Sequence, residues 1–336
     1  EWKAKAVGRS HIDYGFHVIV GDASDATLAE IPRLVDLGYP SLKVFMINEF
    51  RIADEALLRV FEAARQVGVI VNVHAENGDM LDHCTRNLLA AGRRDPRYYA
   101  QSRPAGAEAE GARPAGGRTP RSSAQRGPAA PEAEATRRAI EYAALVDAEI
   151  YIVHLSCADA LEAVSRARRR GLRIWAETRP IYLALTEDRY AAGGTEAAKF
   201  VGAPPLRTAR DQSALWEGLR SGDIQAIGSD NTSWRVEQKA EGAADFTRIP
   251  YGVPGLETEM RVIYSEGVSG GRIELETFVA AFSTNPARIF GLYPQKGTIA
   301  VGGDADMVVF DPARTAVVDE RRLDLRARYD PFNVLQ

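Results

Sequence analysis

The sequence is poor in cysteine and carries almost no excess of charge. Its 336 residues include two cysteines, Cys84 and Cys157, which are too few for a disulfide framework. The formal net charge of -4 gives no basic footprint for nucleic acid or acidic lipid. We therefore expect a protein of the reducing cytoplasm that binds neither nucleic acid nor a membrane.

Long apolar runs and a secretory signal are also missing, because no stretch is apolar for the length that crosses a bilayer. The first residue is Glu1 instead of methionine, so we expect that part of the protein precedes it. What remains is ordinary globular composition, with 45% hydrophobic and 26% charged residues. A chain of this length and composition can bury a large core.

The first third of the chain alternates between two patterns. Residues 11–20, 39–48 and 69–77 are apolar runs that predict strands, whereas 25–38 and 54–68 show the spacing of amphipathic helices, each closed by a glycine. Short links join them. Strands alternating with helices indicate parallel β/α units, which build doubly wound sheets or barrels.

Residues 104–131 interrupt this alternation. They are rich in Ala, Gly, Pro and Arg and contain almost no large apolar side chain, so we expect a disordered insert. The alternation then resumes. Helices are predicted at 134–147, 157–171 and 211–222, and strands at 149–156, 172–185 and 224–231. A long polar loop follows at 231–257, and helices are predicted again around 258–290. Residues 297–312 predict short strands with glycine turns, outside a barrel.

Four chemically suggestive residues lie at or near the carboxyl ends of predicted strands: Lys43, His74, His154 and Asp230. In a β/α barrel these ends converge on one mouth, where active sites are built. Two imidazoles, a carboxylate and a lysine suit a borderline cation such as zinc. The sequence therefore predicts a metal site at the barrel mouth.

Lys43 is the unusual member, because it lies inside an apolar run. A buried lysine must lose its charge, find a partner or be modified. If its amine reacts with carbon dioxide, the resulting carbamate offers two oxygens that can bridge two metals. A hydroxide between those metals would be a nucleophile at neutral pH, and Asp230 could carry its proton to a leaving nitrogen.

Structural roles explain each of these residues taken singly. A lone histidine at a strand end more often makes a hydrogen bond than binds a metal, a buried lysine is more often an ion-pair partner, and "GSDN" is more often a turn. The coincidence of all four at successive strand ends favours the metal site. We expect His11, His17 and His83 to be structural or at the surface.

Several longer stretches resemble one family. "SLKVFM", "VNVHAENGDMLD", "YIVHLSC", "GAPPLR", "IGSDN", "DFTRIPYGVPGLETEM" and "FSTNPARIFGLYPQKGTIAVGGDADMVVFDP" look like the hydantoinase and dihydropyrimidinase branch of the cyclic amidohydrolases. The resemblance covers nearly the whole chain apart from 104–131. It implies a TIM-type (β/α)8 barrel over 1–292, incomplete at its N-terminus, and part of a small β-sandwich domain over 293–336.

The same resemblance implies a chemistry and a site. Two divalent metal ions, expected to be zinc, would be bridged by carboxylated Lys43. His74 and His154 would hold one metal, and Asp230 would bind the other and act as the proton-transferring base. The family reaction opens a small cyclic amide, a hydantoin or a dihydropyrimidine ring. Members are usually homotetramers.

The chain departs from the family pattern in its metal ligands and in its substrate positions. The HxH pair that binds the first metal occurs nowhere in the sequence, and Glu1 aligns after the strand that carries it. We therefore expect that this chain holds the first metal poorly and is weakly active. Asn48 stands where the family has a substrate-binding tyrosine, Ala203 where it has serine and Tyr251 where it often has asparagine, which leaves the ring substituent open.

Two alternatives stay open. One is another ring opener of the same superfamily, an allantoinase or a dihydroorotase, although "DFTRIPYGVPGLETEM" favours the hydantoinase branch. The other is a non-catalytic relative that keeps the fold as a binding or scaffold partner. Loss of Lys43 or Asp230 would favour the second alternative, and both residues are present.

Replacement of Lys43 by alanine tests the predicted bridge. Lys43→Ala removes the amine that would carry the carbamate, so we expect loss of two-metal binding and of most activity, with the barrel still folded. Elemental analysis measures the metal and circular dichroism measures the fold. Undiminished two-metal binding in this variant would contradict the role.

Overall fold

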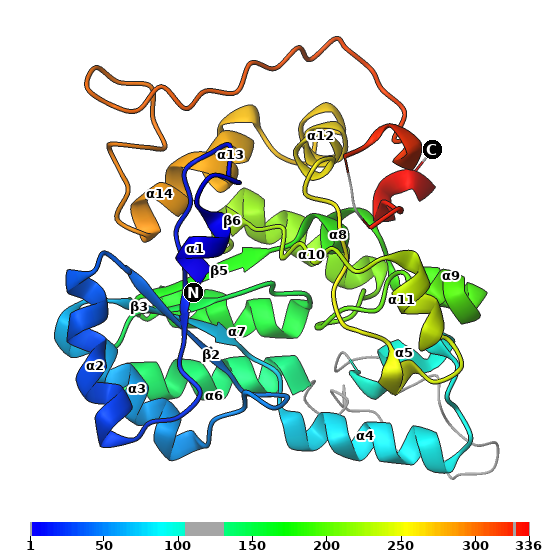
Figure 1. The fold of residues 1–336 in the computed structure, drawn as a ribbon, viewed down its shortest axis with the longest axis horizontal. Helices are drawn as coiled ribbons and strands as arrows, with labels where there is room; N and C mark the ends of the chain where they lie inside the picture. The colour runs from blue at the N-terminus through cyan, green and yellow to red at the C-terminus, as the bar shows by residue number, and fades with distance from the viewer. Residues whose placement is uncertain (1, 105–130, 325–326, 336) are drawn as a thin grey trace.

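A computed structural model describes residues 2–104, 131–324 and 327–335 (Figure 1). Its strands are β1 Val18–Ile19, β2 Ser41–Phe45, β3 Ile70–His74, β4 Ile150–Ile152, β5 Ile174–Thr178 and β6 Ala226–Ile227. Its α-helices are α1 Trp2–Ala6, α2 Asp25–Asp36, α3 Asp54–Val67, α4 Gly78–Ala90, α5 Tyr99–Ser102, α6 Pro131–Val146, α7 Ala158–Arg169, α8 Pro180–Ala184, α9 Gly194–Ala198, α10 Ala209–Ser221, α11 Val236–Glu241, α12 Glu259–Ile263, α13 Leu275–Val279 and α14 Asn285–Ile289.

The six strands form one parallel sheet in the order β1-β2-β3-β4-β5-β6, so each strand pairs with the next one along the chain. This order is that of consecutive β/α units wound in one direction, as in a barrel. The register places Lys43 of β2 between Ile19 and Asn72, and Phe45 beside His74. The predicted α/β class with parallel strands is confirmed.

Helices form an outer layer around this sheet. Neighbouring helices pack in chain order: α2 on α3, α3 on α6, α6 on α7 and α7 on α10. In Figure 1, α3, α6 and α7 lie along one side of β2 and β3, as the outer ring of a barrel does. None of the helices in the described part of the chain is long and apolar enough to cross a membrane.

Three predicted elements differ from the structure. The strand predicted at 11–20 is reduced to Val18–Ile19. The strand predicted at 172–185 ends at Thr178, because Pro180 begins α8 at a position where its missing N–H costs nothing. The polar loop at 231–257 contains α11. Sequence reasoning also missed α4, whose side-chain cap is Asn77.

The C-terminal part differs most from its prediction. Residues 293–324 and 327–335 contain no strand in the structure, whereas short strands were predicted at 297–312. Figure 1 shows the segment after α14 crossing the molecule as an extended chain. A strand needs a neighbour for its backbone hydrogen bonds, and this segment has none among the described residues. Val301 and Val309 point to solvent, and Val309 is 99% exposed. The insert predicted at 104–131 lies, except for its two end residues, outside the described residues.

One charged side chain in the core binds the backbone of two loops. Lys239 of α11 is fully buried, and its Nζ donates hydrogen bonds of 2.6 Å to the carbonyls of Val201 and Pro250. The backbone of Gly252 also donates to Val201, at 3.2 Å. Burial strips the ammonium of water and Arg179 repels it, so the pKa of Lys239 falls from 10.5 to about 7.

This lowered pKa makes stability depend on pH. Between pH 7 and pH 10.5 the unfolded chain keeps a proton on Lys239 that the folded chain has released, so the folded state gains as pH rises through that window. Below pH 7, Lys239 is charged in both states, and the folded state carries the full cost of burying that charge. We expect the unfolding free energy of wild type, relative to Lys239→Met, to rise between these two pH values. Urea denaturation at several pH values measures this, and parallel curves would contradict it.

Candidate active site

The strand ends bring two of the four predicted residues into direct contact. His74 ends β3 and His154 follows β4, and their rings lie 4.4 Å apart between centroids at an interplanar angle of 70°. Both side chains are buried, with 4% and 5% exposure. His154 takes a left-handed backbone with φ 41°, which turns the chain sharply after the strand. Burial lowers the pKa of both imidazoles, so both rings are neutral and can act as ligands.

Each ring has a distinct set of partners. Nε2 of His74 lies 2.8 Å from Oε2 of the fully buried Glu76. Nδ1 of His154 is buried and has no hydrogen-bond partner in the structure. An unpartnered buried nitrogen is costly, and a ligand that accepts its lone pair removes that cost. The pair therefore suits a cation placed between the two rings.

Lys43 faces the same interior. Its side chain is half-buried, and its Nζ lies 5.0 Å from the ring centroid of Phe45. Desolvation lowers the pKa of this amine to about 8, although the carboxylates of Glu177 and Asp230 pull the pKa up. A fraction of the amine is consequently neutral near pH 7, and only the neutral form has the lone pair that can attack carbon dioxide.

Glu177, on β5, is a site residue that sequence reasoning missed. Its carboxylate accepts hydrogen bonds from Tyr151 Oη at 2.9 Å and from the backbone N–H of His154 at 3.3 Å. Gly228 gives it room, since a Cβ there would lie 2.4 Å from Glu177 Oε2. An acid within the otherwise apolar strand "IWAET" was the available signal, because buried carboxylates need partners.

Asp230 forms an ion pair with a buried arginine. Its Oδ2 is 3.2 Å from Nη1 of Arg179, whose side chain is fully buried while that of Asp230 is 43% exposed. Arg179 also donates to the backbone carbonyls of Ser229 at 3.0 Å and Asp230 at 3.2 Å. These bonds hold Asp230 in a left-handed conformation with φ 43°. Arg179 is a second residue that sequence reasoning missed.

The ligand set is therefore only partly gathered. The rings of His74 and His154 lie in contact, whereas in the described residues neither histidine nor Asp230 belongs to a group of three ligand atoms within 4.8 Å of one another. In the described parts of the chain, the one such group is Asp13, Asp304 and Asp306. Nζ of Lys296 forms ion pairs with all three carboxylates, so a cationic group already lies among them.

The three predicted substrate residues lie in different surroundings. Asn48 is exposed just beyond β2, with φ 61°, and Ala203 is half-buried. Tyr251 is 37% exposed and packs against Tyr99 and the guanidinium of Arg103. Their common role stays a prediction.

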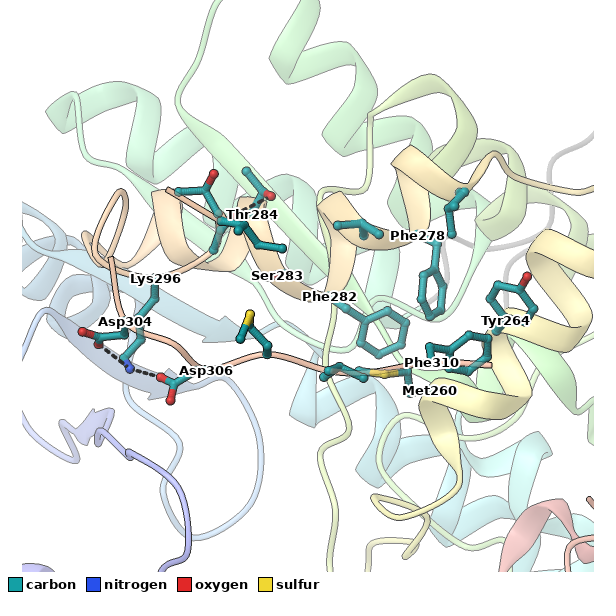
Figure 2. Close-up of a pocket in the computed structure, with 17 residues that line it drawn as sticks. Met260, Tyr264, Phe278, Phe282, Ser283, Thr284, Lys296, Asp304, Asp306 and Phe310 are labelled. Carbon is teal, nitrogen blue, oxygen red and sulfur yellow. Dashed lines mark hydrogen bonds and ion pairs between the residues drawn. The ribbon is translucent and has the colours of Figure 1, made fainter. Parts of the chain in front are cut away.

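A separate cavity of about 550 Å³ lies under the extended C-terminal segment (Figure 2). Figure 2 shows aromatic rings meeting there from three parts of the chain, among them Tyr264, Phe278 and Phe310. None of the predicted metal or substrate residues lines it. Its lining combines apolar side chains with Lys296, Asp304 and Asp306, which form ion pairs with one another.

Comparison with known proteins defines the class to which this barrel and its histidine pair belong. The model of the Amidohydrolase family matches residues 46–335, and the chain belongs to that family. Among its relatives, D-hydantoinase from Geobacillus stearothermophilus is 41% identical over 335 residues, and D-hydantoinase from Rhizobium radiobacter is also 41% identical. These alignments cover 98% and 99% of this chain, but only 66% and 68% of the relatives. The chain thus spans about two thirds of their length.

Solved structures give the same result. Dihydropyrimidinase from Brevibacillus agri superposes with a TM-score of 0.89 at 42% identity, covering 98% of this chain and 68% of that one. L-Hydantoinase from Arthrobacter aurescens superposes with a TM-score of 0.80 at 29% identity, covering 95% and 66%. The predicted hydantoinase branch of the cyclic amidohydrolases is confirmed.

Replacing Arg179 tests its hold on Asp230. Arg179→Gln removes a fully buried guanidinium that binds the carboxylate of Asp230 and two backbone carbonyls, so we expect a loss of about 3 kcal/mol of unfolding free energy. The control is Arg97→Gln, which breaks a 3.1 Å ion pair with Asp95 between half-exposed side chains and should cost less than about 1 kcal/mol. Urea denaturation compares the two, and equal losses would contradict the role of Arg179.

Proposed function

We propose that the chain is the catalytic part of a metal-dependent hydrolase that opens a cyclic amide ring. The observation that carries this proposal is the pair of buried neutral imidazoles beside a lysine of lowered pKa, at the strand ends of a barrel. The names of the relatives, D-hydantoinase and dihydropyrimidinase, support a five- or six-membered ring as substrate. The ring substituent and its stereochemistry stay open.

Each site residue has a proposed part. His74 and His154 would hold one divalent metal, and Lys43, carboxylated on Nζ, would bridge it to a second one. When bound, such metals supply the nucleophile and polarise the amide carbonyl. Zinc is the proposed metal, because neutral imidazoles and carboxylate-type oxygens are ligands that it accepts.

Asp230 would move the proton. Its carboxylate reaches solvent and substrate because the side chain is 43% exposed, and Arg179 keeps it in one place. A base held in one geometry can take a proton from the attacking water and deliver it to the leaving nitrogen as the ring opens. Asn48 and Tyr251 are proposed to contact the ring, and the assembled protein is proposed to be a homotetramer.

Hydrolysis of simple rings by the 336-residue chain tests the proposal. The chain is loaded with zinc in bicarbonate, and ring opening of hydantoin and dihydrouracil is followed by the loss of ring absorbance. We expect slow, chelator-sensitive turnover, lowered by orders of magnitude in Asp230→Asn. The matched control is Asp79→Asn, which changes an exposed carboxylate paired with Arg51.

The outcomes separate cleanly. Zinc bound at the histidines with chelator-sensitive ring opening supports the proposal. Near-normal rates in Asp230→Asn, or no ring opening and no zinc binding in the wild-type chain, would contradict it. Two zinc ions per chain with full turnover would instead overturn the expectation that the first metal is held poorly.

A further inference from the structure

Four charged side chains lie buried behind the histidine pair. Glu76, Arg103, Glu132 and Arg207 have exposed fractions between 0% and 5%. They come from the ends of β3, α5 and α6 and from the loop before α10. Burying four charges is expensive, and well-packed apolar residues often stabilise a fold as well or better. The arrangement therefore indicates a role other than stabilising the fold.

The first half of this group contacts His74. Glu76 Oε2 lies 2.8 Å from Nε2 of His74 and 2.7 Å from Nη1 of Arg103. The buried guanidinium of Arg103, paired with this carboxylate, keeps it ionised. An ionised carboxylate only accepts hydrogen bonds. Nε2 of the neutral ring must therefore carry the proton, which leaves the lone pair on Nδ1.

The second half fixes the chain beside His154. Arg207 donates to the carbonyl of Arg103, to Ser156 Oγ at 3.0 Å and to Glu132 Oε2 at 2.9 Å. Glu132 in turn accepts from the backbone N–H of Ser156 at 2.7 Å and from its hydroxyl. Ser156 lies two residues after His154, in the turn that starts at φ 41°. One continuous set of bonds thus joins the ring of His74 to the backbone two residues after His154.

From this geometry we propose that Glu76, held by Arg103, is a positioning residue that sets the tautomer and the ring direction of His74 for a divalent metal ion shared with His154. This proposal rests on the proposed function. A carboxylate on the outer nitrogen makes the inner nitrogen a stronger ligand and reduces the ways in which the ring can turn. Nδ1 of His74 and the unpartnered Nδ1 of His154 are the ligand atoms that the proposal assigns.

The test measures metal affinity and the imidazole proton separately. Cobalt(II) serves as the probe, with its affinity for the 336-residue chain measured by chelator competition. We expect Glu76→Gln to bind it about 10–100-fold more weakly. Since this variant leaves Arg103 buried without its carboxylate, the paired change Glu76→Leu with Arg103→Met removes both charges and provides a second variant that should fold.

The imidazole proton is read without metal. Proton–nitrogen NMR of histidine-labelled apo protein should show a slowly exchanging Nε2–H signal from His74 in wild type, and its loss in the paired variant. The control is Asp211→Asn, which changes an equally buried carboxylate that accepts from Ala158 N–H at 2.9 Å and from Thr208, away from both histidines. It should keep both the cobalt affinity and the signal.

Three results would overturn the proposal: wild-type cobalt affinity in both Glu76 variants, an equal loss in Asp211→Asn, or a proton on Nδ1 of His74 in wild type. A wild-type chain that shows the Nε2–H signal but binds no cobalt would refute the metal in the proposed function, while the hold of Glu76 on the ring would stand.

Discussion

The cost of burying charge is the constraint on which this structure depends. The barrel interior holds an amine, two imidazoles and several carboxylates where a fold of this size needs only apolar side chains. The sheet brings them together, because parallel strands in sequential order end at one edge. Each group then has either a partner, as Glu177 has in Tyr151, or a shifted pKa, as Lys43 has. Nδ1 of His154 has no partner, and a ligand can satisfy it.

Arginine meets this requirement in two places, and in each its side chain contacts both backbone and a carboxylate. Arg179 reaches the carbonyls on both sides of the turn at Asp230, and Arg207 reaches the carbonyl of Arg103. A planar guanidinium offers five donors in fixed directions, which a lysine cannot match. Loops that would otherwise be mobile are thereby attached to the barrel, and the side chains they carry share its rigidity.

The sequence allowed the barrel class and the positions of its site to be predicted, but not the supporting contacts. Apolar runs and glycine stops predicted β2, β3, α3 and α7, because burial on both faces leaves a clear local pattern. Lys43 stood out inside such a run, and His74 at the end of one. Arg179 and Glu76 did not, since their importance comes from partners that are distant in sequence. Residues 172–185 were mistaken for one strand, because an apolar run does not reveal where Pro180 starts a helix.

The C-terminal segment, which pairs with no strand among the described residues, affects how the protein behaves in concentrated solution. Val301, Val309 and Val317 stand outward on extended backbone that pairs with no strand among the described residues. Such a ribbon is a template onto which another molecule can add its own backbone, and β-branched residues favour that addition. Concentrated solutions of this polypeptide should therefore self-associate through this ribbon, and a lysine in place of Val309 would act as a gatekeeper against precipitation.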